Sequence, residues 1–131
     1  MKIKEIMKDV KTISPDETVK DAAVLMNKYS IGSLVVVDSK KKIVGIVTER
    51  DIMQKVTAPN KLAGKVLVED IMSNKLITID ANELLDDAVY LMIKNKIKKL
   101  PVTDNNELVG IVTATDIVAN SSEVGEFYLF D

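Results

Sequence analysis

Two threonine–aspartate pairs are the residues of this sequence best suited to binding a small molecule. The stretch Gly45-Ile46-Val47-Thr48-Glu49-Arg50-Asp51 returns 65 residues later as Gly110-Ile111-Val112-Thr113-Ala114-Thr115-Asp116. In each copy a glycine and two β-branched apolar residues precede the threonine, and the aspartate follows it by three positions. This order is typical of a buried β-strand that opens directly into a helix. Both pairs are therefore expected where a strand ends and a helix begins.

The pairs allow a structural and a functional explanation. A threonine at the N-cap with an acid at the third helical position resembles a capping box, in which the hydroxyl accepts a bond from an unpaired backbone N–H. The carboxylate also favours the positive end of the helix. Alternatively, the N–H groups at a helix start suit phosphate, while threonine and aspartate can hydrogen-bond sugar hydroxyls. A single copy favours the capping explanation, and the repetition favours a ligand.

Composition excludes several kinds of chemistry. A chain of 131 residues with 47% hydrophobic content forms one compact unit, or two half-size units that share a core. It contains no cysteine and no histidine, which removes thiolate chemistry, the usual general base and the commonest metal ligand. The acidic pairs Asp86-Asp87 and Glu69-Asp70 are adjacent in sequence, which indicates solvated helix faces and ends rather than a metal cage. No second catalytic group stands at a recognisable spacing from Asp51 or Asp116, so we expect neither a metal site nor an enzyme.

Charge and hydropathy narrow the choice of partners. The N-terminal residues Met1–Glu5 lack the apolar run of a signal peptide, and the apolar runs elsewhere have the length of strands rather than of membrane spans. We therefore expect a cytoplasmic protein without a membrane partner. A net charge of −2 and a pI near 5.2 argue against nucleic acid as a partner. Small molecules therefore remain possible ligands.

The sequence repeats itself at an offset of 65 or 66 residues. The matching segments are Ile6-Met7 and Ile71-Met72, Thr12-Ile13 and Thr78-Ile79, Asp21–Met26 and Asp87–Met92, and Asp38 and Asp104. The change of offset places single-residue differences in two loops. We divide the chain into a first repeat (1–55), a linker (56–66), a second repeat (67–120) and a C-terminal tail (121–131).

Each repeat is expected to fold in the order β-α-β-β-α. In the first repeat a short strand over 10–13 leads into a helix over 18–29, followed by a hairpin with strands 34–37 and 43–47 and by a second helix. The buried stripes of the first helix in each repeat are expected at Val19, Ala22, Ala23 and Met26, and at Leu85, Ala88, Val89 and Met92. A strand, a crossover helix and a returning strand make a parallel pair, to which the hairpin adds an antiparallel strand.

The expected fold class is α/β, or α+β by some schemes, with one small mixed sheet in each repeat. The strands are apolar without alternation, which requires cover on both faces. Helices would cover one face, and the sheet of the other repeat would cover the second. Two sheets that face each other in pseudo-twofold symmetry leave two related clefts, each bordered by one threonine–aspartate pair.

These features resemble tandem cystathionine-β-synthase (CBS) domains, the pair often called a Bateman module. The resemblance covers about residues 1–120 and rests on the two repeated stretches and on Leu100-Pro101-Val102-Thr103-Asp104. It also rests on Ile6-Met7 and Ile71-Met72, which stand before the first strand of each repeat and are called the Ile-Met openings below. It implies regulatory binding of AMP, ADP, ATP or a related ligand such as S-adenosylmethionine in the clefts between the repeats, without a cofactor. The aspartate of each pair would bind ribose hydroxyls, and the threonine would contact ribose or phosphate.

The resemblance also implies ligand contacts beyond the two pairs. Such sites are lined by backbone around the first strand, by a small helix residue beside the base and by the opening of the second strand. These positions are Thr12, Ile13, Ala22, Ile31, Gly32 and Ser33 in the first repeat, and Thr78, Ile79, Ala88, Ile97, Lys98 and Lys99 in the second. Arg50 stands where the second repeat has Thr115, and Lys98-Lys99 stands where the first has Gly32-Ser33. Each site would thus draw its cation from a different segment, so the two should differ in preference.

The leading hypothesis from the sequence is a stand-alone sensing module whose ligand changes the activity of a separate effector protein. The alternative is a structural or dimerisation scaffold with unoccupied clefts. CBS modules usually dimerise through the first helix of each repeat, and Val24 and Tyr90 lie away from the buried stripes, so we expect a homodimer. Residues 1–66 carry a net charge of +5 and residues 67–131 a net charge of −7, which favours contact between unlike repeats. The aromatic residues Phe127, Tyr128 and Phe130 would cover the partner or fold back on their own chain.

Overall fold

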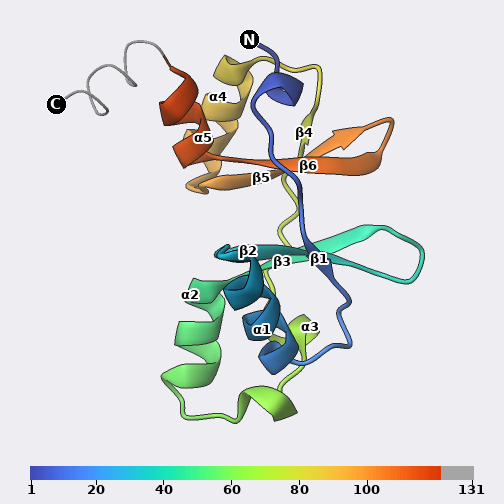
Figure 1. The fold of residues 1–131 in the computed structure, drawn as a ribbon, viewed down its shortest axis with the longest axis vertical. Helices are drawn as coiled ribbons and strands as arrows, with labels where there is room; N and C mark the ends of the chain where they lie inside the picture. Colours follow the sequence, from blue (N-terminus) through green and yellow to red (C-terminus); the bar gives the residue numbers. More distant parts are fainter. Residues whose placement is uncertain (122–131) are drawn as a thin grey trace, which may run out of the picture. The chain divides into compact units, whose positions relative to one another are not determined.

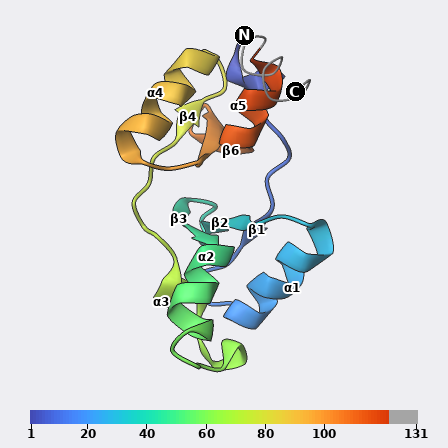
Figure 2. The same cartoon turned by 90° about the vertical axis from the view of Figure 1, so that its left-hand side faces the viewer.

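The computed structural model describes residues 1–121, which form two compact units, each with one three-stranded sheet (Figures 1 and 2). The first-repeat unit consists of Lys11–Leu76. The second-repeat unit consists of Met1–Val10 together with residues 77–121. The first ten residues therefore fold with the second repeat, and the residues up to Leu76 fold with the first. The tail aromatics Phe127, Tyr128 and Phe130 lie outside the described residues.

The first-repeat unit contains the mixed sheet that the sequence predicts. Its strands are β1 (Thr12–Ile13), β2 (Ser33–Val37) and β3 (Ile43–Thr48). β1 runs parallel to β2, and β3 runs antiparallel to it. Its helices are α1 (Val19–Tyr29), α2 (Glu49–Ile52), a π-helical continuation (Met53–Thr57), a 3-10 turn (Ala63–Lys65) and α3 (Val68–Ile71). α1 and α2 lie on the same face of the sheet (Figure 1).

The second-repeat unit has the same plan. Its strands are β4 (Ile79–Asp80), β5 (Lys99–Asp104) and β6 (Glu107–Thr113), in the order β4-β5-β6 with a parallel and an antiparallel pair. Its helices are a 3-10 turn (Ile3–Glu5), α4 (Leu85–Asn95) and α5 (Ala114–Asn120). The predicted fold class, with one small mixed sheet in each repeat, is confirmed.

The long helices bury most of the stripes that their spacing predicts, whereas Ala23, Leu85 and Val89 are half-buried. In α1, Val19, Ala22 and Met26 are buried, whereas Val24 is 56% exposed. In α4, Ala88 and Met92 are buried and Tyr90 is 62% exposed. Both helices stop at a residue in the left-handed conformation, Ser30 and Lys96 respectively, as α-helices commonly do.

Each core is completed by a segment from outside its own β-α-β-β-α sequence. Ile3 and Ile6 belong to the core of the second-repeat unit, and Val68 and Ile71 belong to the core of the first-repeat unit. The same segments pair with the outer edge of the last strand. Lys8 exchanges two backbone hydrogen bonds with Ile111 (2.9 and 3.0 Å), and Ser73 exchanges two with Ile46 (2.9 and 3.0 Å). These bridges cover edges that would otherwise expose unpaired backbone groups.

The close approach of these segments explains the glycine in each repeated stretch. A Cβ at Gly45 would lie 2.7 Å from Met72 Sδ and 2.7 Å from the Ser73 carbonyl oxygen. A Cβ at Gly110 would lie 2.8 Å from Met7 Sδ and 3.0 Å from the Lys8 carbonyl oxygen. Each glycine thus contacts the methionine of one Ile-Met opening, although the two lie far apart in the sequence.

The region expected as a linker, 56–66, is folded within the first-repeat unit. Val56 is 2% exposed and belongs to its core, and the Val66 carbonyl accepts a hydrogen bond from the Val19 N–H (2.8 Å). The chain passes between the units after Val10 and after Leu76. No helix in residues 1–121 combines the length and apolar character needed to span a membrane.

Candidate functional site

The pair Thr48 and Asp51 forms a capping box at the junction of β3 and α2. The Asp51 N–H donates to Thr48 Oγ1 (3.2 Å), and the Thr48 N–H donates to Asp51 Oδ2 (2.9 Å). The Thr48 hydroxyl also donates to Oδ2 (3.1 Å). The second carboxylate oxygen, Oδ1, lies outside the cap and faces Lys55 Nζ at 3.5 Å. Half of the carboxylate is therefore structural and half is presented to a cation.

Thr113 and Asp116 repeat this arrangement at the junction of β6 and α5. The three corresponding hydrogen bonds measure 3.2, 3.0 and 2.9 Å. Asp116 Oδ1 again lies outside the cap, and its cation is Lys8 Nζ at 3.7 Å. The Asp116 side chain is 6% exposed, whereas that of Asp51 is 16% exposed.

Capping by itself does not identify a binding site, because Thr18 and Asp21 form the same box at the start of α1. Their hydrogen bonds measure 3.2, 3.1 and 2.9 Å, and both residues fall outside the predicted site. The structural explanation of the repeated pairs is thus confirmed. It does not exclude the functional explanation, because the cap leaves Oδ1 unused.

The cap also limits what the remaining atoms can bind. The proton of each threonine hydroxyl is directed at Oδ2, so the hydroxyl offers an incoming group only its remaining lone pair. The aspartate Oδ1 likewise only accepts. A partner at these atoms must therefore donate, as a sugar hydroxyl or an amine does, and a phosphate is unsuited to them. Of the two partners expected for the threonine from the sequence, ribose fits these atoms and phosphate does not.

The opening of the second strand lies beside the pair in each unit. Ser33 is the register partner of Thr48, and the Glu49 N–H donates to the Gly32 carbonyl (3.0 Å). In the second-repeat unit, Lys99 is the register partner of Thr113, and the Ala114 N–H donates to the Lys98 carbonyl (2.8 Å). The structure therefore brings these predicted residues together with the pairs.

The other predicted residues occupy less accessible or separate positions. Ala22 and Ala88 are fully buried, and the Ile13 and Ile79 side chains are 4% exposed within the cores. Thr12 and Thr78 are exposed at the first strands, Arg50 and Thr115 are exposed in the first turn of α2 and α5, and Ile31 and Ile97 are half-buried against the cores. Their role in ligand binding stays a prediction.

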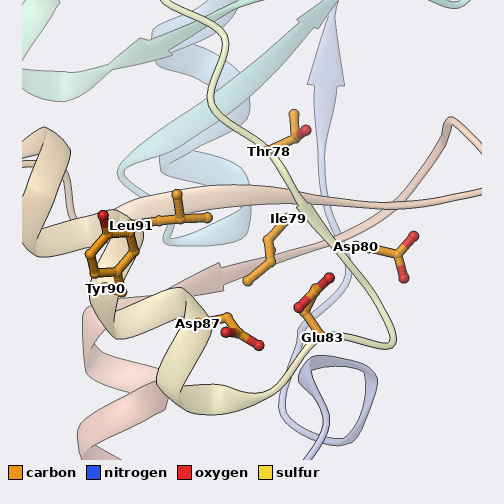
Figure 3. Close-up of a pocket in the computed structure, with 7 residues that line it drawn as sticks. All are labelled: Thr78, Ile79, Asp80, Glu83, Asp87, Tyr90 and Leu91. Atoms are coloured by element: carbon orange, nitrogen blue, oxygen red, sulfur yellow. The ribbon is translucent and has the colours of Figure 1, made fainter.

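A pocket of about 280 Å³ lies within the second-repeat unit, between the β4 region and α4 (Figure 3). It is lined by Thr78, Ile79, Asp80, Glu83, Asp87, Tyr90 and Leu91. Thr78 and Ile79 were predicted site residues, and the other five were not. Three of these five are acidic and form what we call the acidic wall: Asp80, Glu83 and Asp87. The sequence offers a signal for two of them, because the first repeat also has acids, Glu17 and Asp21, at the positions of Glu83 and Asp87, with Ser14 at the position of Asp80.

The wall of this pocket is strongly acidic. Hydrogen bonding with Asp87 and repulsion from its charge raise the pKa of Glu83 above its usual value, and the charge of Asp80 adds to the effect. Such a wall repels a phosphate rather than binding it. Within residues 1–121 no cluster of acidic side chains has a geometry suited to a metal ion.

Comparison with known proteins decides the family. A sequence model of the CBS domain matches this chain twice, at residues 3–58 and 68–123. The chain belongs to the CBS domain family. Each match contains one threonine–aspartate pair and one Ile-Met opening. The sequence-based identification is therefore confirmed.

Curated CBS relatives differ in length from this chain. An uncharacterized protein of Methanopyrus kandleri is 42% identical over 112 residues, which are 85% of this chain and 57% of that protein. The CBS domain-containing protein YhcV of Bacillus subtilis is 38% identical over 85% of this chain and 78% of its own length. An inosine-5′-monophosphate dehydrogenase of Methanocaldococcus jannaschii is 38% identical, but the match covers 22% of that enzyme. This likeness to an enzyme is thus confined to its CBS region.

Solved CBS structures share the fold over nearly the whole chain. A putative signal-transduction protein with CBS domains from Burkholderia ambifaria has a TM-score of 0.84 and 31% identity, covering 91% of this chain and 92% of that one. The CBS domain pair of protein MJ0100, in complex with 5′-methylthioadenosine and S-adenosyl-L-methionine, has a TM-score of 0.78 and 31% identity, covering 89% and 92%. A CBS domain pair similar to this chain therefore binds adenosyl compounds.

Proposed function

We propose that the protein is a regulatory module that binds an adenosyl ligand at its two threonine–aspartate pairs and thereby alters a separate partner protein. The observation that carries the proposal is the acceptor set left by each cap. The aspartate Oδ1 and one threonine lone pair are the acceptors that each cap leaves, and a ribose offers two vicinal hydroxyl donors. The complex of protein MJ0100 with two adenosyl compounds supports this choice of ligand.

The remainder of the ligand would lie near the cations around each pair. Arg50 follows Thr48 by two residues, and Lys98 and Lys99 adjoin Thr113 through the β5–β6 pairing. An adenine nucleotide places phosphate next to its ribose, so AMP, ADP and ATP are the first ligands to test. S-adenosylmethionine carries a sulfonium in place of phosphate and serves as the comparison ligand.

Isothermal titration calorimetry with these four ligands tests the proposal. We expect Asp51→Asn and Asp116→Asn each to weaken one binding event by about 1.5–3 kcal/mol, the range for a hydrogen bond to a charged group. Asp21→Asn is the matched control, because Asp21 forms a capping box of the same kind with Thr18 but lies outside the proposed site. Equal losses in all three variants would attribute the effect to helix capping and would contradict the site.

The proposed role is sensing rather than turnover. A ligand shifts the partner only through a difference in its affinity for two states, so nucleotide hydrolysis is not required. We expect intact AMP and ATP to be recovered after prolonged incubation with the protein. Product formation that disappears in Asp116→Asn would instead favour an enzyme.

We also propose that the protein forms a homodimer through α1 and α4. A structural scaffold that binds no ligand would form the same dimer. Val24, Tyr90 and Ile93 are 56%, 62% and 73% exposed on these helices. Opposite net charges of the two repeats favour contact of α1 with α4 of the second copy. Among CBS neighbours, a CBS-CP12 protein from cyanobacteria is hexameric, with a TM-score of 0.87, 30% identity and coverage of 96% of this chain and 74% of that one.

Light scattering of a Val24→Glu, Tyr90→Glu variant tests this dimer. We expect a monomer, because the substitutions place charge on both apolar helix faces. Leu62→Glu is the control, since Leu62 is 69% exposed and lies outside both helices. A disulfide between two copies of Val24→Cys would place like repeats together and would contradict the proposed orientation. A dimer that binds none of the four ligands would favour the scaffold.

A further inference from the structure

The N-terminal segment Met1–Val10 reaches a predicted ligand residue that lies more than a hundred positions away in the sequence. Lys8 Nζ lies 3.7 Å from Asp116 Oδ1, the carboxylate oxygen that the α5 cap does not use. The sequence alone assigns no role to Lys8, because this residue adjoins neither threonine–aspartate pair. Only the fold of the second-repeat unit brings it to the threonine–aspartate pair.

The backbone of Lys8 is firmly placed. Its N–H and carbonyl exchange hydrogen bonds with Ile111 on β6, and Met7 packs against Gly110. Ile3 and Ile6, at 0% and 6% exposure, hold the rest of the segment in the core. The Lys8 side chain itself is 72% exposed, so the segment fixes its origin while its ammonium stays accessible to a ligand.

The separation of Lys8 and Asp116 leaves the ammonium able to bind another anion. At 3.7 Å the two groups attract each other, but the distance exceeds that of an N–H···O hydrogen bond. The ammonium has three donors, and no hydrogen bond from it is found within residues 1–121. A ligand that donates a hydroxyl to Oδ1 would therefore bring its own anionic group beside an unoccupied donor.

We propose that Lys8 binds the phosphate of an adenine nucleotide held at Thr113 and Asp116, and that the nucleotide thereby stabilises the docked N-terminal segment. The proposal rests on the proposed function and adds a residue and a coupled segment to it. Because a ligand that contacts the docked segment binds the docked state better, it must shift the segment toward docking. The segment is thus the part of the chain that responds to occupation of this site.

The first-repeat unit provides an internal contrast. Lys55, the cation of Asp51, already donates to the Ile71 carbonyl (2.8 Å) and lies one helical turn after Asp51 on the same run of helix. One of its donors is occupied, and its backbone moves with the aspartate. Occupation of the Asp51 site is therefore expected to affect residues 1–10 little.

An NMR titration of the full chain with AMP and with adenosine tests the proposal, with the Thr113 amide as the reporter of this site. We expect Lys8→Met to weaken AMP binding about tenfold, as for the loss of one hydrogen bond to a charged group, while adenosine binding changes less than about twofold. Lys8→Arg keeps the charge and should retain most of the AMP affinity. Lys4→Met, which removes another exposed lysine of the same segment, is the matched control and should bind AMP like the parent.

Hydrogen exchange of the Ile111 amide is the second measurement, because this N–H donates to the Lys8 carbonyl. Saturating AMP should slow its exchange in the parent, and should slow it less in Lys8→Met. Equal weakening of AMP and adenosine by Lys8→Met, or unchanged AMP affinity, would overturn the role of Lys8. Unchanged exchange of Ile111 in the AMP-bound parent would overturn the coupling. If the parent binds neither AMP nor adenosine, the proposed function fails and this proposal fails with it.

Discussion

The two threonine–aspartate pairs have the same cap and different surroundings. Both aspartates use Oδ2 within the cap and present Oδ1 to a lysine. In the first-repeat unit that lysine is Lys55, four residues after Asp51. In the second-repeat unit it is Lys8, from the opposite end of the chain. A local feature is therefore repeated, while the cation beside it is supplied by a different part of each unit.

This difference separates what a short motif fixes from what it leaves open. Four residues are enough to build a capping box, which is why the same box also occurs at Thr18 and Asp21. The cation beside the unused oxygen has a different origin in each unit: Lys55 lies one helical turn after Asp51, whereas Lys8 belongs to a segment that pairs with the last strand. The two sites can therefore differ in ligand preference although their motifs match.

The largest predicted effect concerns the segments that complete the two cores. Ile6→Ala and Ile71→Ala should each lower the free energy of unfolding by about 2–5 kcal/mol, because each removes a buried side chain from one core. Urea denaturation gives the size of the loss. Hydrogen exchange locates it: Ile6→Ala should expose the Ile111 amide first, and Ile71→Ala the Ile46 amide.

Leu62→Ala is the control for this comparison, since Leu62 is 69% exposed and lies outside the helices of the proposed dimer. It should change the unfolding free energy by less than about 0.5 kcal/mol. If Ile6→Ala accelerated exchange at Ile46 as strongly as at Ile111, the two units would unfold together and the assignment of each segment to one core would lose its support.

A smaller effect should distinguish the two glycines. Gly45→Ala and Gly110→Ala should each lower the unfolding free energy by about 1–3 kcal/mol, because the added methyl group overpacks the contact with a methionine and a backbone carbonyl. Gly45→Ala should be the more harmful, since its carbonyl contact is 2.7 Å rather than 3.0 Å. Thermal unfolding measures the order, and the reverse order would show that the first-repeat unit yields more readily.

The two lysines should differ in their contribution to stability. Lys55→Met loses the hydrogen bond to the Ile71 carbonyl and should lower the unfolding free energy by about 0.5–1.5 kcal/mol. Lys8→Met loses only an ion pair in which the Lys8 side chain is itself 72% exposed, so about 0–1 kcal/mol is expected. Urea denaturation without ligand measures both. A larger loss for Lys8→Met would assign Lys8 a structural role in addition to the proposed ligand contact.

The smallest predicted effect depends on pH and on the acidic wall of the second-repeat unit. The folded state raises the pKa of Glu83 above its ordinary value of 4.5, so the folded chain holds this proton more tightly than the unfolded chain. The stability that this proton provides is present in acid and is lost as the pH rises through the raised pKa. Glu83→Gln should therefore stabilise the protein at pH 7, with a gain that shrinks toward pH 4.

Glu17→Gln is the matched control for this pH dependence. Glu17 occupies the corresponding position in the first repeat, where Ser14 replaces Asp80 and one carboxylate is missing. Its effect on the melting temperature at pH 7 should be smaller than that of Glu83→Gln. Equal effects would mean that Asp80 contributes nothing to the repulsion at Glu83.

The sequence predicted the fold because its signals are local and occur twice. The spacing of Val19, Ala22 and Met26 predicted a helix with one buried face, and the threonine–aspartate pairs predicted a helix start at the end of a strand. Both expectations depend on residues within one or two helical turns of each other. Because the pattern occurs twice, each prediction for one repeat could be compared with the same pattern in the other repeat.

The sequence did not predict which segment completes which core. Ile6-Met7 opens the first repeat and Ile71-Met72 opens the second, yet each packs in the other unit, against the glycine of its last strand. Such pairing depends on contacts between residues distant in sequence, which periodicity does not register.

The sequence by itself therefore determined the repeated architecture, the capping boxes and the family of this protein. Hydrogen bonds between neighbouring residues and a regular pattern of apolar side chains specify these features locally. Only the tertiary structure decided that Asp116 pairs with Lys8, and that the Ile71 carbonyl occupies one donor of Lys55. These contacts join segments that meet only when the cores close, because burial of Ile3, Ile6, Val68 and Ile71 brings them together.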